Sequence, residues 1–142
     1  MALKDVSQAL WAERELLEQL LFKLEEERAL VRSGNTRWIN RCIEEIRTVM
    51  VRLEEAEEAR RELWIDVAHQ LGLDSEASLK DLISRMAFPW DSIFNEHQRA
   101  LSQAARECQT TAVDDDDRLA DTGAIELTRR LRWLSPQGAS AA

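Results

Sequence analysis

The two histidines of the chain offer little that could perform catalysis. Zinc proteases bind their metal through two histidines four residues apart on one helix, in the pattern H-E-x-x-H. The segment Asn95-Glu96-His97-Gln98 contains a single histidine, and His69 lies in a different part of the chain. Bundle enzymes that bind paired metal ions need Glu-x-x-His, but Asp66 and Phe94 stand three residues before the two histidines. We therefore expect both histidines to be ordinary helix-face residues.

The other groups with reactive side chains also lack a suitable setting. Cys42 and Cys108 are expected to remain thiols, because free cysteine commonly serves as a small core hydrophobe and two cysteines do not make a disulfide framework. The run Asp114–Asp117 lacks the D-x-D-x-D-G spacing and the distant glutamate of a calcium loop. The sequence has no glycine-rich phosphate loop and no nucleophile elbow. It therefore predicts no enzyme, no metal and no cofactor.

Composition excludes several classes of function and indicates one class of fold. The chain has 19 basic and 27 acidic residues, a net charge of -8, and such a surface repels the phosphates of nucleic acids. No apolar run approaches the ~20 residues needed to cross a bilayer, and the first residues carry no secretion signal, which predicts a cytoplasmic protein without membrane insertion. With 4 glycines and 2 prolines, turn-rich β folds are disfavoured. The expected fold class is all-α.

Two long amphipathic helices are predicted over residues 5–71. In the first, apolar residues recur at steps of three and four from Val6 to Val31, which places them on one side of a helix. In the second, over residues 37–71, they follow a near-strict heptad, typical of coiled packing against a neighbouring helix. Gly34 permits the left-handed conformation that ends the first helix. Because the connection is short, we expect the two helices to form a long antiparallel hairpin.

Shorter helices are predicted to follow the hairpin. Ser78 and Asp81 have the spacing of a capping box, which predicts a short helix over residues 78–87. A further helix is predicted over residues 89–109, starting at a proline in an allowed first-turn position. We therefore assign residues 1–109 to an elongated helical bundle.

Residues 110–142 are predicted to form a separate C-terminal region. The heptad phase breaks at Thr110, and Asp114–Asp117 cannot be buried, so we expect an acidic, solvated joint there. Leucines then lie on one side of an amphipathic terminal helix, and residues 135–142 are expected to be a disordered tail. Tryptophan is enriched at interface hot spots, so Trp133 in this helix is expected to touch a partner. Three other tryptophans are expected to anchor helix junctions: Trp38, Trp64 and Trp90.

Several stretches of the chain resemble one known family. Residues 10–27 read L-W-x-E-R-E-L-L-E-x-L-L-F-K-L-E-E-E, and residues 33–38 read S-G-x-T-R-W. This combination is similar to the FlgN-like family of flagellar export chaperones in its actinobacterial form. Further similar positions follow along the chain: Leu71-Gly72-Leu73, Pro89-Trp90, His97, Arg99 and Leu101. The resemblance covers about residues 3–101, and after about Ala105 the sequence departs from the family pattern, which predicts an interrupted fourth helix.

The resemblance implies a cytoplasmic chaperone that binds hook-associated proteins, the subunits of the hook–filament junction. Such a chaperone holds the C-terminal helical segment of its client and delivers it to the flagellar type III export apparatus. In physical terms this is helix-in-groove recognition, in which apolar side chains of the client complete a bundle. The partner-binding residues expected here are Phe94, Leu101, Leu119, Leu127, Leu131, Trp133 and Leu134.

A structural role is the alternative. The heptads could pair with copies of themselves, which would make the chain a self-associating coiled-coil or adaptor protein without an export client. A homo-oligomer is therefore possible. A constitutive dimer or tetramer with every heptad face occupied would favour this alternative.

Overall fold

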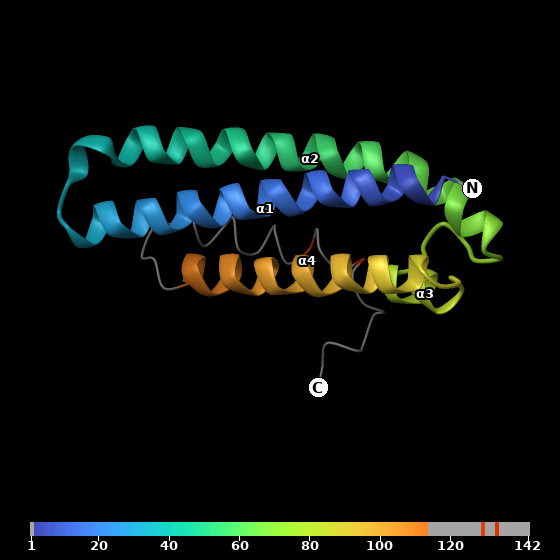
Figure 1. Ribbon diagram of the computed structural model, residues 1–142. Coiled ribbons are helices and arrows are strands. Elements are labelled where there is room, and N and C mark those ends of the chain that lie inside the picture. Colours follow the sequence, from blue (N-terminus) through green and yellow to red (C-terminus); the bar gives the residue numbers. More distant parts are fainter. Residues whose placement is uncertain (1, 114–128, 130–132, 134–142) are drawn as a thin grey trace.

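A computed structural model describes residues 2–113, 129 and 133 of the chain, and within them every regular element is helical. The predicted hairpin is confirmed. Helix α1 spans Leu3–Arg32, and α2 spans Ile39–Gln70 after a 3-10 turn, η1, at Thr36–Trp38. Gly34 has a φ of 70°, the left-handed conformation that closes α1 and that a side chain would oppose. Figure 1 shows α1 and α2 running antiparallel along the length of the molecule.

The two shorter helices are present, but their ends differ from the expectation. Helix α3 spans Leu79–Ser84, and its predicted capping box is formed: the Asp81 N–H donates to Ser78 Oγ, while the Ser78 N–H donates to the Asp81 carboxylate. The helix stops three residues before the predicted end at 87. Helix α4 spans Trp90–Val113 and therefore continues past the predicted end at 109.

The expected phase break at Thr110 was wrong, and the reason lies in the next residue. Thr111 is buried, and it continues the buried positions of α4 one turn beyond Cys108. Its hydroxyl donates to the Glu107 carbonyl at 2.8 Å, so the polar group finds a partner within its own helix. Because this hydrogen bond satisfies the hydroxyl, Thr111 can be buried and can continue the apolar face of α4.

Helix α1 lies between α2 and α4 (Figure 1) and packs on both of them. Helix α4 runs parallel to α1: His97 is bonded to Ser7, and further along both helices the Cys108 thiol donates to the Leu17 carbonyl at 3.5 Å. The buried apolar side chains follow one face of each long helix. In α1 they are Leu3, Val6, Leu10, Leu17, Leu20 and Leu24; in α2 they are Cys42, Ile46, Val49, Leu53, Trp64, Val67 and Ala68.

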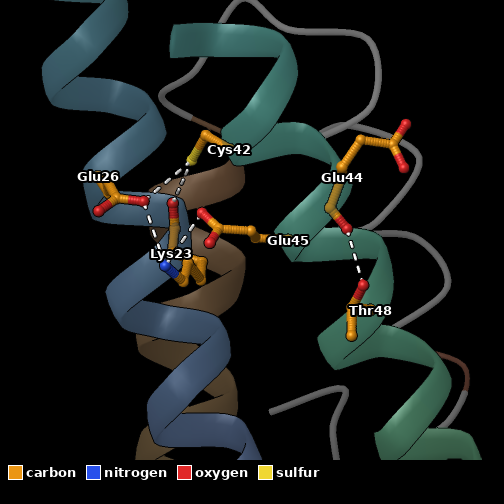
Figure 2. A network of polar contacts seen from close by, with 6 residues as sticks. All are labelled: Lys23, Glu26, Cys42, Glu44, Glu45 and Thr48. Carbon is orange, nitrogen blue, oxygen red and sulfur yellow. Dashed lines mark hydrogen bonds and ion pairs between the residues drawn. The ribbon is translucent and has the colours of Figure 1, made fainter.

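Polar contacts tie α1 to α2 near the turn of the hairpin, as Figure 2 shows. The Lys23 ammonium donates to Glu26 of its own helix at 3.4 Å and to Glu45 of α2 at 3.3 Å. The Cys42 thiol lies 3.5 Å from both the Lys23 carbonyl oxygen and the Glu26 carboxylate, to which it donates. These bonds hold α1 and α2 in register near the turn of the hairpin.

Candidate interaction site

His97 is a structural residue of the α1–α4 contact. Its ring is buried, with Nε2 2.9 Å from Ser7 Oγ and Nδ1 3.3 Å from the Arg14 guanidinium. Because guanidinium can only donate, Nδ1 accepts and Nε2 carries the hydrogen given to Ser7. Burial, aided by the positive charge of Arg14, lowers the pKa of His97 to about 4. The ring is therefore neutral at physiological pH.

Both cysteines are buried free thiols, as the sequence predicts. Burial is the main cause that raises the pKa of Cys42, and separately that of Cys108, to about 12. A thiol with such a pKa is not a nucleophile near neutral pH, because the thiolate is the reactive form. The part of the chain that the structure describes also contains no group of three or more His, Cys, Asp or Glu residues able to hold a metal.

A buried ion pair crosses the α1–α2 interface. Arg60 Nε donates to Glu13 Oε1 at 2.9 Å, and both side chains are almost fully covered, at 6% and 2% exposed. Burial raises the pKa of the Glu13 carboxyl above its ordinary value, and the Arg60 charge and hydrogen bond only partly counteract this. Burying both charges costs free energy, and any other register of α1 and α2 would leave one of them buried without its partner. The pair therefore favours the register that brings Glu13 and Arg60 together.

The ion pair forms part of a seat for Trp133. The Arg60 guanidinium lies 3.8 Å from the centre of the Trp133 ring, a cation–π arrangement. Trp64 meets the same ring edge to face, with centroids 5.4 Å apart and planes at 80°. Trp64 is itself fixed by its Nε1–H, which donates to the Ala77 carbonyl at 3.0 Å, and this confirms its role at a helix junction. Trp133 is half-buried and packs against the core.

The structure separates the residues that the sequence analysis grouped as a partner-binding face. Phe94 and Leu101 are fully buried between α4 and α1, at 0% exposed, so neither lies on the surface. A partner could touch them only after α4 had moved away from α1. Trp133 is seated against α2. The other four predicted residues, Leu119, Leu127, Leu131 and Leu134, lie outside the described residues, as do the acidic joint and the tail.

Sequence reasoning missed the exposed aromatic residues. Trp11 is 52% and Phe22 is 60% exposed, and both are on α1. Phe88 is 81% exposed in the connection before α4. Trp38, expected to anchor a junction, is instead 42% exposed at the hairpin turn, whereas Trp90 stacks on Phe94 at the start of α4. The available signal was position: Trp11 and Phe22 fall outside the apolar stripe of the first helix.

Comparison with known proteins identifies the chain. The family model described as FlgN protein matches residues 1–114. The chain belongs to the FlgN family. Its members are chaperones of flagellar assembly, so the resemblance found in the sequence is confirmed. No curated protein and no solved structure matches the chain.

The FlgN match also bears on the length of the resemblance. It extends past Leu101 and past Ala105 to the end of α4, whose helix is continuous through Val113. The expected departure from the family pattern after Ala105 was therefore placed too early. In the described residues of this FlgN-family chain, no helix is long and apolar enough to cross a membrane.

Proposed function

We propose that this chain is a cytoplasmic export chaperone that binds the C-terminal helical segment of hook-associated flagellar proteins and delivers them to the flagellar type III export apparatus. The observation that carries the proposal is the FlgN match over residues 1–114, which places the chain among flagellar export chaperones. The proposal gives this general role a client and a destination.

The arrangement of the helices supports binding of a helical client. Helix α1 lies between α2 and α4, and Trp133 lies on α2 against Arg60 and Trp64. A client helix bound beside Trp133 would add to this layer and bury its own apolar side chains, the usual mode of helix-in-groove recognition. We retain the apolar C-terminal residues as the proposed binding face: Leu119, Leu127, Leu131, Trp133 and Leu134. Phe94 and Leu101 contribute from beneath, by holding α4 on α1.

The alternative role, a coiled coil that associates with copies of itself, is less well supported than the chaperone role. Most heptad positions of α2 are buried within the chain itself, namely Cys42, Ile46, Val49, Leu53, Arg60 and Val67, whereas Ala56 and Leu63 are half-buried. They are therefore not available to a second copy unless the hairpin opens. Self-association would need a different surface.

Truncation tests the proposed function. Removing residues 117–142 should abolish co-purification with hook-associated subunits, while circular dichroism should still show a helical hairpin. Removing residues 135–142 alone is the matched control and should leave binding intact, because it keeps every residue of the proposed face. Equal client binding by the 117–142 deletion and the full chain would place the binding site elsewhere. If the full chain binds no hook-associated C-terminal segment, the proposed client is wrong.

A further inference from the structure

The outer face of α1 carries two large aromatic residues that the fold covers only in part. Trp11 and Phe22 are 52% and 60% exposed. They are eleven residues apart, about three helical turns or ~16 Å, and so lie on the same face of the helix. Single exposed apolar residues are common on protein surfaces, but two in line on one face are a candidate for an interaction surface.

The residues between the two aromatics complete a recognisable spacing. Glu15 and Glu18 lie four and seven residues after Trp11, and Phe22 follows four residues later. This alternation of four and three is the spacing of a seam at which two helices pair. In the buried seam of α1 most such positions are apolar, whereas here both inner positions are acidic. We call Trp11, Glu15, Glu18 and Phe22 the outer seam.

A groove runs beside the outer seam toward α2. It has a volume of about 660 Å³ and is lined by Glu15, Glu18, Gln19, Phe22, Lys23 and Val49. The lining combines two apolar residues, Phe22 and Val49, with two carboxylates, Glu15 and Glu18, and such a mixture can accept the side chains of an amphipathic helix laid along α1.

Glu15 and Glu18 of the outer seam are exposed, and Lys23 lies nearby, 5.6 Å from the centre of the Phe22 ring. Neither Glu15 nor Glu18 has an ion pair within the described part of the chain. The two neighbouring cations are engaged elsewhere. Lys23 pairs with Glu26 and Glu45, and Arg14 lies 3.8 Å from the centre of the Trp11 ring and bonds to His97. A positively charged partner would therefore meet two carboxylates that are free to pair.

We propose that the outer seam is a docking surface for an amphipathic helix of another protein, one that carries basic residues between two apolar anchors. The apolar anchors would pack on Trp11 and Phe22, and the basic residues would pair with Glu15 and Glu18. A second copy of this chain fits poorly, because a symmetric pair of outer seams would bring carboxylates against carboxylates. The surface uses no residue after Val113, so it is separate from the proposed client-binding face and does not depend on it.

A designed helix tests this surface directly. The probe is a stapled, fluorescent helical peptide with leucines eleven positions apart and arginines four and seven positions after the first leucine. The staple removes the cost of forming an isolated helix. We expect the full chain to bind it, as measured by fluorescence anisotropy. Trp11→Ala/Phe22→Ala should weaken binding at least about tenfold, the loss typical of truncating interface anchors. Val51→Ala/Ile65→Ala, which removes exposed apolar groups of α2, should leave binding unchanged.

Charge reversal supplies the second arm of the test. A peptide with glutamates in place of the arginines should bind the unaltered chain at least about tenfold more weakly, and Glu15→Lys/Glu18→Lys should invert this preference. All the substituted residues are at least partly exposed, but the Trp11 ring meets His97 edge to face with centroids 5.3 Å apart, so the fold of each variant is checked by circular dichroism before binding is compared. Equal binding of both peptides, or binding that ignores Trp11→Ala/Phe22→Ala, would overturn the proposal. So would a dimer, seen by sedimentation velocity, that the aromatic substitutions abolish, because a second copy would then occupy the surface.

Discussion

Replacing Arg60 by methionine should destabilise the fold far more than the loss of an ordinary surface charge. The substitution removes the partner of Glu13 and leaves a carboxylate that is 2% exposed between two helices. Breaking a buried ion pair by removing one member costs about 3–5 kcal/mol, because the remaining charge has lost both water and its counterion. Since small domains are stable by only about 5–15 kcal/mol, this is a large share of the total.

The chain provides a matched control one residue further on. Arg61 pairs with Glu58 at 2.8 Å, but those side chains are 60% and 65% exposed. Arg61→Met should therefore change stability by less than about 1 kcal/mol, as exposed pairs do. Unfolding in urea, followed by circular dichroism at pH 7.5, measures both variants. The double variant Glu13→Leu/Arg60→Met should recover much of the loss, because apolar residues often replace a buried pair without net cost.

The pH dependence of Arg60→Met gives an independent check. Burial already raises the pKa of Glu13, and removing Arg60 removes the two largest interactions that oppose this, leaving only the charge of Arg61. The folded variant then binds a proton at a pH at which the unfolded chain, with a carboxyl pKa near 4.5, does not. Its stability deficit should consequently shrink as the pH falls from 7.5 toward 5. A deficit equal to that of Arg61→Met, or one independent of pH, would refute the account of the buried pair.

Three further predictions follow from the same structure. The pKa of His97 is lowered to about 4, so between pH 6.5 and 4 the unfolded chain binds more protons than the folded chain. Unfolding titrations should therefore show the free energy of unfolding decreasing as the pH is lowered from 6.5 to 4, and this decrease should be smaller in His97→Gln. Gly34→Ala should lower the free energy of unfolding by about 1–2 kcal/mol in urea titrations, because alanine resists a φ of 70° even though no atom lies within 4 Å of the added carbon. Cys42 and Cys108 should react slowly with a thiol reagent at pH 8 in the native protein and rapidly in denaturant, because burial raises the pKa of each thiol to about 12.

The hairpin was predictable because its signals are local. Apolar spacing and Gly34 decide where each helix runs and where it stops, and the capping box of Ser78 and Asp81 depends on a separation of three residues. Each of these features is visible within one stretch of sequence. The end of α4 was harder to predict, because a threonine counts as polar in the sequence pattern. Only the structure shows that the Thr111 hydroxyl bonds to a carbonyl of its own helix.

The interaction surface was harder to predict because periodicity does not say what covers a face. Phe94 and Leu101 have the spacing of a binding face, and the structure uses that spacing to pack α4 on α1. The Glu13–Arg60 pair was missed because each charge sits at a core position of a different helix, and only the register between the helices brings them together. The clues were present: Glu13 fills a gap in the apolar series between Leu10 and Leu17, and Arg60 occupies a heptad position.

The parallel course of α4 and α1 leaves the two ends of the hairpin unequally supported. Cys108 already lies against Leu17, and α4 ends at Val113, while α1 continues to Arg32 (Figure 1). Within the described part of the chain, the last turn of α1 and the first turn of α2 therefore lie past the end of α4. Segments with fewer buried contacts open more readily than the rest of a protein. The turn of the hairpin should accordingly open and reclose locally more often than the opposite end, which holds Arg60 and His97.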